Sequence, residues 1–246
     1  MIYIKRWLDY YEELFPIEQN QIEFLQGLCN KFPSPAKFLS VEAGTALLSR
    51  KMAEANNEVT ITDTYTEFIS LLHSHQTEIT NKIHAFNLPP MDIVRYLGKN
   101  FYNLIYCGDY RLIFIKDKAQ VQKLLFDSKM LLSDGGYIVL DLINFAKYNF
   151  SGPRIDLAVQ KSDRVELYSY ILKDAATLKY TLNQQVVTKD GQSIDEVKNE
   201  PITPISLETF KRTAEIAKFS SIEFYSDYYG HPLKEDSDKI ICVLKK

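Results

Sequence analysis

The sequence predicts an α/β protein with a parallel sheet covered by helices, followed by a small antiparallel meander. Three observations support this fold. Short apolar runs rich in β-formers alternate with segments of helical spacing up to about residue 150, as in helix-covered parallel sheets. Apolar and polar residues then alternate over 155–187, and the chain closes with a helix and two strands. The 246 residues, 46% of them hydrophobic, suffice for one large domain.

Five apolar runs before residue 150 are the predicted strands of the parallel sheet. They are KFLSV at 37–41, EVTIT at 58–62, KIHAF at 82–86, YNLIYC at 102–107 and GGYIVLDLI at 135–143. Helical spacing of apolar residues predicts one helix over 45–57 and another over 117–130, which stops at the turn signal SDGG.

The pattern changes after Pro153. Alternation of apolar and polar residues predicts three antiparallel strands over 155–187. The polar stretch TKDGQSIDEVKNEPITP at 188–204 is predicted to be a loop. Ser206 is expected to cap a helix, LETFKRTAEIAKF at 207–219. Two strands, within SSIEFYSDYYGHP and KIICVLKK, are predicted to close the chain.

Composition limits the partners and the setting. The net charge is −3, and Lys and Arg are scattered through the chain, so we expect a small-molecule partner, no nucleic acid and no membrane. Cys29, Cys107 and Cys242 match no zinc or CxxC spacing, which predicts a reducing, cytoplasmic setting and no metal. The N-terminus lacks the apolar core of a signal peptide.

The stretch FLSVEAGTA at 38–46 joins the first predicted strand to a helix. Nucleotides bind parallel sheets at such loops, because backbone amides and the positive end of the helix dipole point there. Gly44 would allow close approach of a ligand. Asp63 ends the second strand 19 residues later, where an acid can accept hydrogen bonds from ribose hydroxyls. A strand-ending Asp alone is as often a helix N-cap, so the pair carries the prediction.

With these elements in order, the chain resembles the class I S-adenosylmethionine-dependent methyltransferases, in their small-molecule branch, over nearly its whole length. The family's first-strand motif is approximately V-L-D-x-G-C-G-T-G, and Gly44-Thr45 matches its G-T pair. KMLLSDGGYIVLDLIN is similar to the family's L-K-P-G-G-x-L-V-x-D element, and 206–246 is similar to its final helix and antiparallel hairpin. The resemblance implies a Rossmann-like, mostly parallel seven-stranded sheet with helices on both faces and an antiparallel last strand.

The resemblance also implies the domain organisation. One domain would span 1–246, with an N-terminal helical cover at 1–30 and a β-meander cap at 155–200 that roofs the substrate pocket. In the cover, YYEELFP is similar to a Y-D-x-L-Y sequence that folds over the cofactor in the family, with Tyr11 and Phe15 in the aromatic places. An amphipathic surface helix packed on the sheet explains these residues equally well.

S-adenosylmethionine is the cofactor that the resemblance implies, with S-adenosylhomocysteine as its product. Asp63 takes the place of the ribose acid, and Asn87 and Leu88 take the places of residues that flank adenine. Cys107 and Gly108 end the fourth strand near the ligand. The predicted cofactor-binding residues are Tyr11, Glu42, Ala43, Gly44, Asp63, Thr64, Asn87, Leu88, Cys107 and Gly108.

Three loop positions depart from the family motif: Ser40 replaces its acid, Glu42 its first glycine and Ala46 its last. Glu42 either supplies the cofactor's cations with the negative charge lost at Ser40, or obstructs the ligand. Two functions therefore stand. One is methyl transfer to a small molecule by in-line displacement, and the other is ligand or partner binding by a catalytically inactive methyltransferase fold. A nicotinamide oxidoreductase is disfavoured because its glycine fingerprint is absent.

The acceptor side of the site is predicted from loops at the same edge of the sheet. His231, after the sixth strand, is the candidate catalytic base for an acceptor that must lose a proton. Tyr110 and Arg111, just past the fourth strand, and Tyr229, beside His231, are candidate substrate contacts. His231 is also explained as an exposed loop residue, and Tyr110 and Arg111 as surface residues of the following helix. The acceptor's identity and the oligomeric state, a possible homodimer included, stay open.

Overall fold

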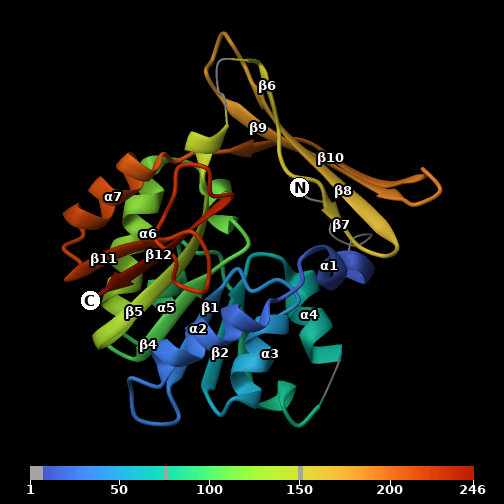
Figure 1. Cartoon of the computed structure of the whole chain (residues 1–246). Coiled ribbons are helices and arrows are strands. Elements are labelled where there is room, and N and C mark those ends of the chain that lie inside the picture. Colours follow the sequence, from blue (N-terminus) through green and yellow to red (C-terminus); the bar gives the residue numbers. More distant parts are fainter. Residues whose placement is uncertain (1–7, 75–76, 149–151) are drawn as a thin grey trace.

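The computed structural model of the chain describes residues 8–74, 77–148 and 152–246, so the first seven residues of the predicted N-terminal cover lie outside it. Within these ranges, no helix has the length and apolar composition needed to cross a membrane. The main sheet has seven strands in the order β11-β12-β5-β4-β1-β2-β3 (Figure 1). They are β1 (Lys37–Val41), β2 (Glu58–Asp63), β3 (Ile83–Asn87), β4 (Tyr102–Cys107), β5 (Leu132–Ile143), β11 (Ser221–Tyr225) and β12 (Lys239–Lys245).

Strand directions in the main sheet follow the predicted topology. The pairs β1-β2, β1-β4, β2-β3 and β4-β5 are parallel. β12 is antiparallel to both β5 and β11, so β11 runs parallel to the other strands. The predicted mostly parallel sheet with an antiparallel last strand is therefore confirmed. One result is that the carboxyl ends of β1, β2, β4 and β5 meet at the same edge.

Helices cover both faces of the main sheet. The α-helices are α1 (Leu8–Leu14), α2 (Gln19–Cys29), α3 (Leu47–Glu54), α4 (Thr66–Ser74), α5 (Ile93–Tyr96), α6 (Lys118–Leu131) and α7 (Leu207–Ile216). In the described ranges, the short 3₁₀ helices are η2 (Thr80–Lys82), η3 (Arg111–Phe114) and η4 (Phe145–Lys147). The predicted cap of α7 is confirmed, because Ser206 accepts from the Thr209 N–H at 3.2 Å. Asp117 caps α6 in the same way and accepts from the Gln120 N–H at 2.8 Å.

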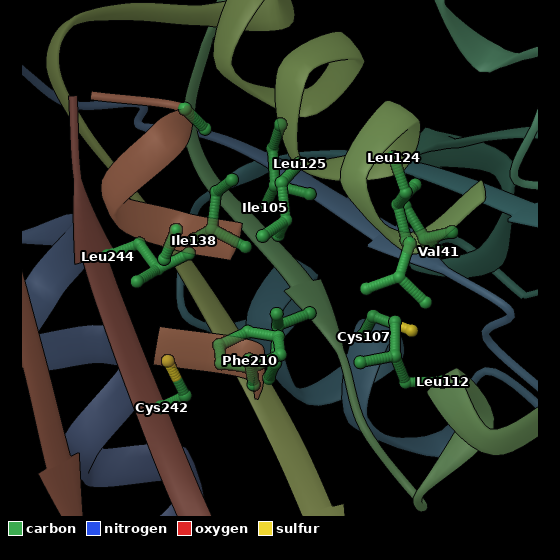
Figure 2. Packing of buried hydrophobic residues seen from close by; sticks show 14 of the residues in the cluster. Val41, Ile105, Cys107, Leu112, Leu124, Leu125, Ile138, Phe210, Cys242 and Leu244 are labelled. Atoms are coloured by element: carbon green, nitrogen blue, oxygen red, sulfur yellow. The ribbon is translucent and has the colours of Figure 1, made fainter. Parts of the chain in front are cut away.

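The core has two large clusters, because neighbouring residues of a strand point to opposite faces of the sheet. Ile105 of β4 lies with Leu125 of α6 and Phe210 of α7 in one cluster, part of which Figure 2 shows. Its neighbour Leu104 lies with Met52 of α3 in the other cluster. Burial on both faces holds the strands in register and so positions the loops at their carboxyl ends.

A second, antiparallel sheet stands above this edge (Figure 1). Its order is β10-β9-β8-β6, with β7 also paired to β8. The strands are β6 (Arg154–Asp156), β7 (Gln160–Lys161), β8 (Val165–Lys173), β9 (Tyr180–Thr188) and β10 (Ser193–Ile202). The predicted loop over 188–204 was wrong, because most of it is β10. That strand lies at the edge of the sheet and has two register shifts, so it lacks the alternation of a half-buried strand.

Helix α1 packs against the second sheet. Leu14 lies in a cluster with Val165 and Leu167 of β8 and Val186 of β9, and Figure 1 shows α1 beneath that sheet. The helix is thus held between the second sheet and the loop edge of the main sheet. This position brings the side chain of Tyr11 to the loop that follows β1.

Candidate cofactor and acceptor site

The loop after β1 keeps a glycine-type backbone at two positions that lack glycine. Glu42, Gly44 and Ala46 have φ angles of 56°, 58° and 59°, all in the left-handed region. Left-handed backbone costs a residue with a Cβ roughly 1–2 kcal/mol. The loop backbone is therefore left-handed at three positions, although this conformation is unfavourable for Glu42 and Ala46. Contacts with surrounding residues must stabilise it.

Asp63 is the clearest of those contacts. Its side chain is fully buried, with 0% of the residue exposed. One carboxylate oxygen accepts a hydrogen bond from the Gly44 N–H at 2.9 Å, and the other accepts from the Tyr65 N–H at 2.8 Å. Burial raises the pKa of Asp63, and the guanidinium of Arg111 and these two amides oppose the rise. The structure thus brings the predicted pair into direct contact, with Asp63 fixing the loop after β1.

Glu42 brings a second carboxylate to the end of β2. Its Oε1 accepts a hydrogen bond from the hydroxyl of Thr64 at 2.5 Å. Loss of water around this half-buried group and the nearby charge of Asp63 raise the pKa of Glu42 to about 7, against the effects of Thr64 and Arg111. The site therefore makes Glu42 harder to ionise than an exposed glutamate.

Other predicted cofactor residues support the loops. The Asn87 amide donates to the backbone carbonyl oxygens of Asp63 at 2.9 Å and Thr64 at 3.0 Å, while Leu88 packs against the core. Cys107 is a free thiol whose side chain lies in the same core beside Leu112 (Figure 2), and burial raises its pKa. These residues stabilise the turn after β2 and the end of β4.

Tyr11 and Arg111 meet beside the loop after β1. Arg111, at the start of η3, donates a hydrogen bond from Nη2 to the Tyr11 hydroxyl at 2.7 Å. A Cβ added at Gly44 would lie 3.0 Å from the same hydroxyl oxygen, so the Tyr11 ring rests on that glycine. The carboxylates of Glu42, Asp63 and Asp109 all act electrostatically on Arg111. Three acidic groups thus act on Arg111.

Two cavities meet at Tyr11. The larger, of about 160 Å³, lies under the second sheet and is lined by aromatic and apolar side chains together with Tyr110, Arg111 and Asp109. The smaller, of about 40 Å³, lies along the loop after β1 and is lined by Glu42, Ala43 and Gly108, among others. Tyr11, Phe15 and Asp109 line both cavities. The predicted substrate residues Tyr110 and Arg111 therefore face a cavity beside the predicted cofactor loop.

A buried polar network underlies the smaller cavity. Gln21 donates to the Tyr106 hydroxyl at 2.7 Å, and that hydroxyl lies 3.2 Å from both the Tyr228 hydroxyl and a carboxylate oxygen of Asp141. Tyr228 also donates to Asp141. Burial raises the pKa of Asp141 to about 6. The sequence patterns did not predict this network, although Asp141 lies in the run KMLLSDGGYIVLDLIN, where it aligns with the acid of the L-K-P-G-G-x-L-V-x-D element.

His231 and Tyr229 lie away from the two cavities. His231 has 65% of its side chain exposed, and its Nδ1 is 2.8 Å from the Asp227 carboxylate. Tyr229 is 75% exposed. Tyr228, from the same loop, is the residue that turns inward, because its hydroxyl finds Asp141 and Tyr106 as partners. The structure thus does not bring the candidate base to the cavities, and His231 takes no part in the mechanism proposed below.

A Rossmann-like sheet with an antiparallel last strand, an acid bonded to the glycine of the first loop and a cavity under an inserted sheet together define the class I S-adenosylmethionine-dependent methyltransferase fold. No protein-family model matches the chain, and no curated protein matches its sequence. Solved structures agree with the fold.

The CcbJ methyltransferase from Streptomyces caelestis superposes with a TM-score of 0.76 at 14% identity, over 92% of this chain and 93% of that one. A S-adenosylmethionine-dependent methyltransferase from Clostridium acetobutylicum gives 0.75 at 14% identity, over 98% of both chains. The sugar N-methyltransferase KedS8 from a Streptoalloteichus species gives 0.67 at 13% identity, over 96% of this chain and 91% of that one. These three matches show that the methyltransferase fold covers 92–98% of this chain.

Proposed function

We propose that this chain is an S-adenosylmethionine-dependent methyltransferase that methylates a small molecule bound under the second sheet. One observation carries the proposal. The loop after β1 is left-handed at Glu42, Gly44 and Ala46, and the Gly44 N–H donates a hydrogen bond to the Asp63 carboxylate. Two non-glycine residues keep a path that glycine would adopt without strain, and such a path suits close approach of a cofactor to the backbone.

The residues at the loop fit the chemistry of the cofactor. S-adenosylmethionine supplies an electrophilic methyl group on a sulfonium and also carries an ammonium group, so it brings positive charge. Glu42, Asp63 and Asp109 act on Arg111, and Lys239 acts on Asp109, so three carboxylates stand against two cations. An excess of carboxylates favours a cationic ligand where water is largely excluded.

The Tyr11 ring limits the volume that is open to a cofactor beside Gly44. The smaller cavity holds about three or four water molecules, so the Tyr11 ring has to move away from Gly44 when a cofactor binds. Helix α1 and the second sheet cover the space beyond, and a covered site favours aligned in-line transfer. Asp109 lines both cavities, and its carboxylate is placed to accept a proton from an acceptor amine or hydroxyl.

Calorimetric titration with S-adenosylmethionine and S-adenosylhomocysteine tests the proposal. We expect both to bind the wild-type protein, and Gly44→Ala to weaken binding at least tenfold, because the new Cβ would fill the space beside the loop backbone that a cofactor approaches. The new residue would also have to adopt left-handed backbone. The matched control is Gly135→Ala. Gly135 is also left-handed, but among the described residues nothing lies within 4 Å of its added Cβ. No heat and no thermal shift at millimolar ligand would contradict the proposal.

An inactive binding protein is the second candidate, favoured by the contact of Tyr11 with Gly44 and Arg111. In that case Tyr11 would stay on Gly44, and the larger cavity would bind a ligand in the absence of any cofactor. Methyl transfer from labelled S-adenosylmethionine to a panel of small amines and alcohols separates the candidates. A protein that binds a panel member but neither binds nor consumes the cofactor would support the second.

A further inference from the structure

Both carboxylate oxygens of Asp63 accept hydrogen bonds from the protein's own backbone. By position, at the end of β2, it corresponds to the acid that meets a ribose in nucleotide-binding sheets. In the structure it is 0% exposed, and each of its oxygens accepts a backbone N–H, one from Gly44 and one from Tyr65. A ribose hydroxyl needs an oxygen that a ligand can reach. Asp63 therefore lacks the exposure that direct contact requires.

Glu42 places a reachable carboxylate beside it. Its Oε1 is bonded to the hydroxyl of Thr64, the residue directly after Asp63. This contact directs the Glu42 side chain from the loop after β1 across to the end of β2. Glu42 also lines the smaller cavity. The carboxylate is therefore at the sheet position where a ribose binds, and it faces the space that a cofactor would enter.

We infer that Glu42, and not Asp63, is the carboxylate that accepts the hydrogen bonds of the cofactor's ribose hydroxyls. Asp63 is then a positioning residue, which fixes the loop through the Gly44 N–H. Thr64 is a second positioning residue, because its hydroxyl holds Glu42. The inference rests on the proposed function. It differs from a role for Glu42 in binding the cofactor's ammonium group, since the ribose belongs to the adenosine half of the ligand.

Three ligands distinguish these roles: S-adenosylhomocysteine, adenosine, and 2′,3′-dideoxyadenosine, which lacks both ribose hydroxyls. Each is titrated calorimetrically into the wild-type protein, Glu42→Ala and Thr64→Val. We expect the wild-type protein to prefer adenosine to the dideoxy compound by about tenfold or more, as for hydrogen bonds to a charged group. Glu42→Ala should abolish this preference, and Thr64→Val should reduce it. Glu12→Ala, which removes a carboxylate on α1 bonded to Arg50, should leave it unchanged.

The results that would overturn the inference differ from the result that would overturn the proposed function. If Glu42→Ala weakens S-adenosylhomocysteine but leaves the preference for adenosine intact, Glu42 contacts the amino-acid half, and the inference is overturned. If Glu42→Ala strengthens all three ligands, Glu42 is an obstruction, which also overturns it. In both cases the proposed cofactor still binds. If none of the three ligands binds the wild-type protein, the proposed function itself fails.

Discussion

The guanidinium of Arg111 donates to the hydroxyl of Tyr11 at 2.7 Å, across 100 residues of sequence. Its Cζ also lies 5.8 Å from the centroid of the Tyr11 ring and 5.9 Å from that of Phe68. These distances are within the range of cation–π attraction. One half-buried cation thereby joins the N-terminal helix to the turn after β4, between the two cavities.

Removing the Tyr11 hydroxyl should loosen this attachment. We expect Tyr11→Phe to lower the free energy of unfolding by about 1–3 kcal/mol, because Arg111 loses a hydrogen bond from a partly buried charge. Urea denaturation measures the change. Glu12→Gln on the same helix is the control, since its ion pair with Arg50 is partly exposed and should contribute less than about 1 kcal/mol. Equal losses in the two variants would contradict the expected role of Arg111.

The strain of left-handed backbone at Ala46 should appear when the stability changes caused by Ala46→Gly and Ala53→Gly are compared. Ala46 has a φ of 59° just before α3, whereas Ala53 lies within that helix, and both are buried. Ala46→Gly relieves the strain of a Cβ in left-handed backbone, but Ala53→Gly only adds the entropic cost of glycine in a helix. We expect Ala46→Gly to be less destabilising by at least about 1 kcal/mol in urea denaturation. A larger loss at Ala46 would mean that the loop is unstrained.

Asp141 should make stability depend on pH. Its pKa is about 6 in the folded protein against an ordinary 3.8, because it is buried; Asp109 adds to the rise, and Tyr228, Lys239 and Tyr106 oppose it. The folded state therefore keeps a proton that the unfolded chain has lost. The stability that this proton confers is complete below pH 3.8 and is lost as the pH rises through about 6.

The matched variant is Asp141→Asn, which does not titrate and keeps polar atoms for both tyrosine hydroxyls. Between about pH 4 and pH 6, the unfolding free energy of the wild-type protein should fall relative to that of Asp141→Asn, by up to about 3 kcal/mol. Urea titrations at several pH values test this. Parallel pH profiles for the two proteins would show that Asp141 has an ordinary pKa.

Gly108 and Tyr106 should be strongly coupled. A Cβ added at Gly108 would lie 1.8 Å from the Tyr106 hydroxyl oxygen and 2.2 Å from its Cζ, which forces the ring and its buried hydrogen bonds to move. We expect Gly108→Ala to cost about 2 kcal/mol or more. In a Tyr106→Ala background the same change should cost less than half as much. Additive losses in this double-mutant cycle would show that the Tyr106 ring moves aside freely.

Local patterns predicted the main sheet because its strands are buried between helices. The runs KFLSV and YNLIYC coincide with β1 and β4 residue for residue. The strand β10 was missed because an edge strand can be polar on both faces. The contact between Gly44 and Asp63 was predictable because adjacent parallel strands end side by side. The contacts of Tyr106 with Gln21 and Tyr228 span 85 and 122 residues, and no local pattern encodes such distances.

The wall that the two cavities share has a kinetic consequence. Under the proposed function, Tyr11 has to leave Gly44 to admit a cofactor, and Arg111, which donates to the Tyr11 hydroxyl, lines the larger cavity, where the acceptor would bind. An acceptor that engages Arg111 therefore frees Tyr11, and a bound cofactor frees Arg111. The two ligands should favour each other's binding by the same factor. Turnover would then proceed through a ternary complex, and either ligand alone would bind weakly to a site that the protein itself keeps closed.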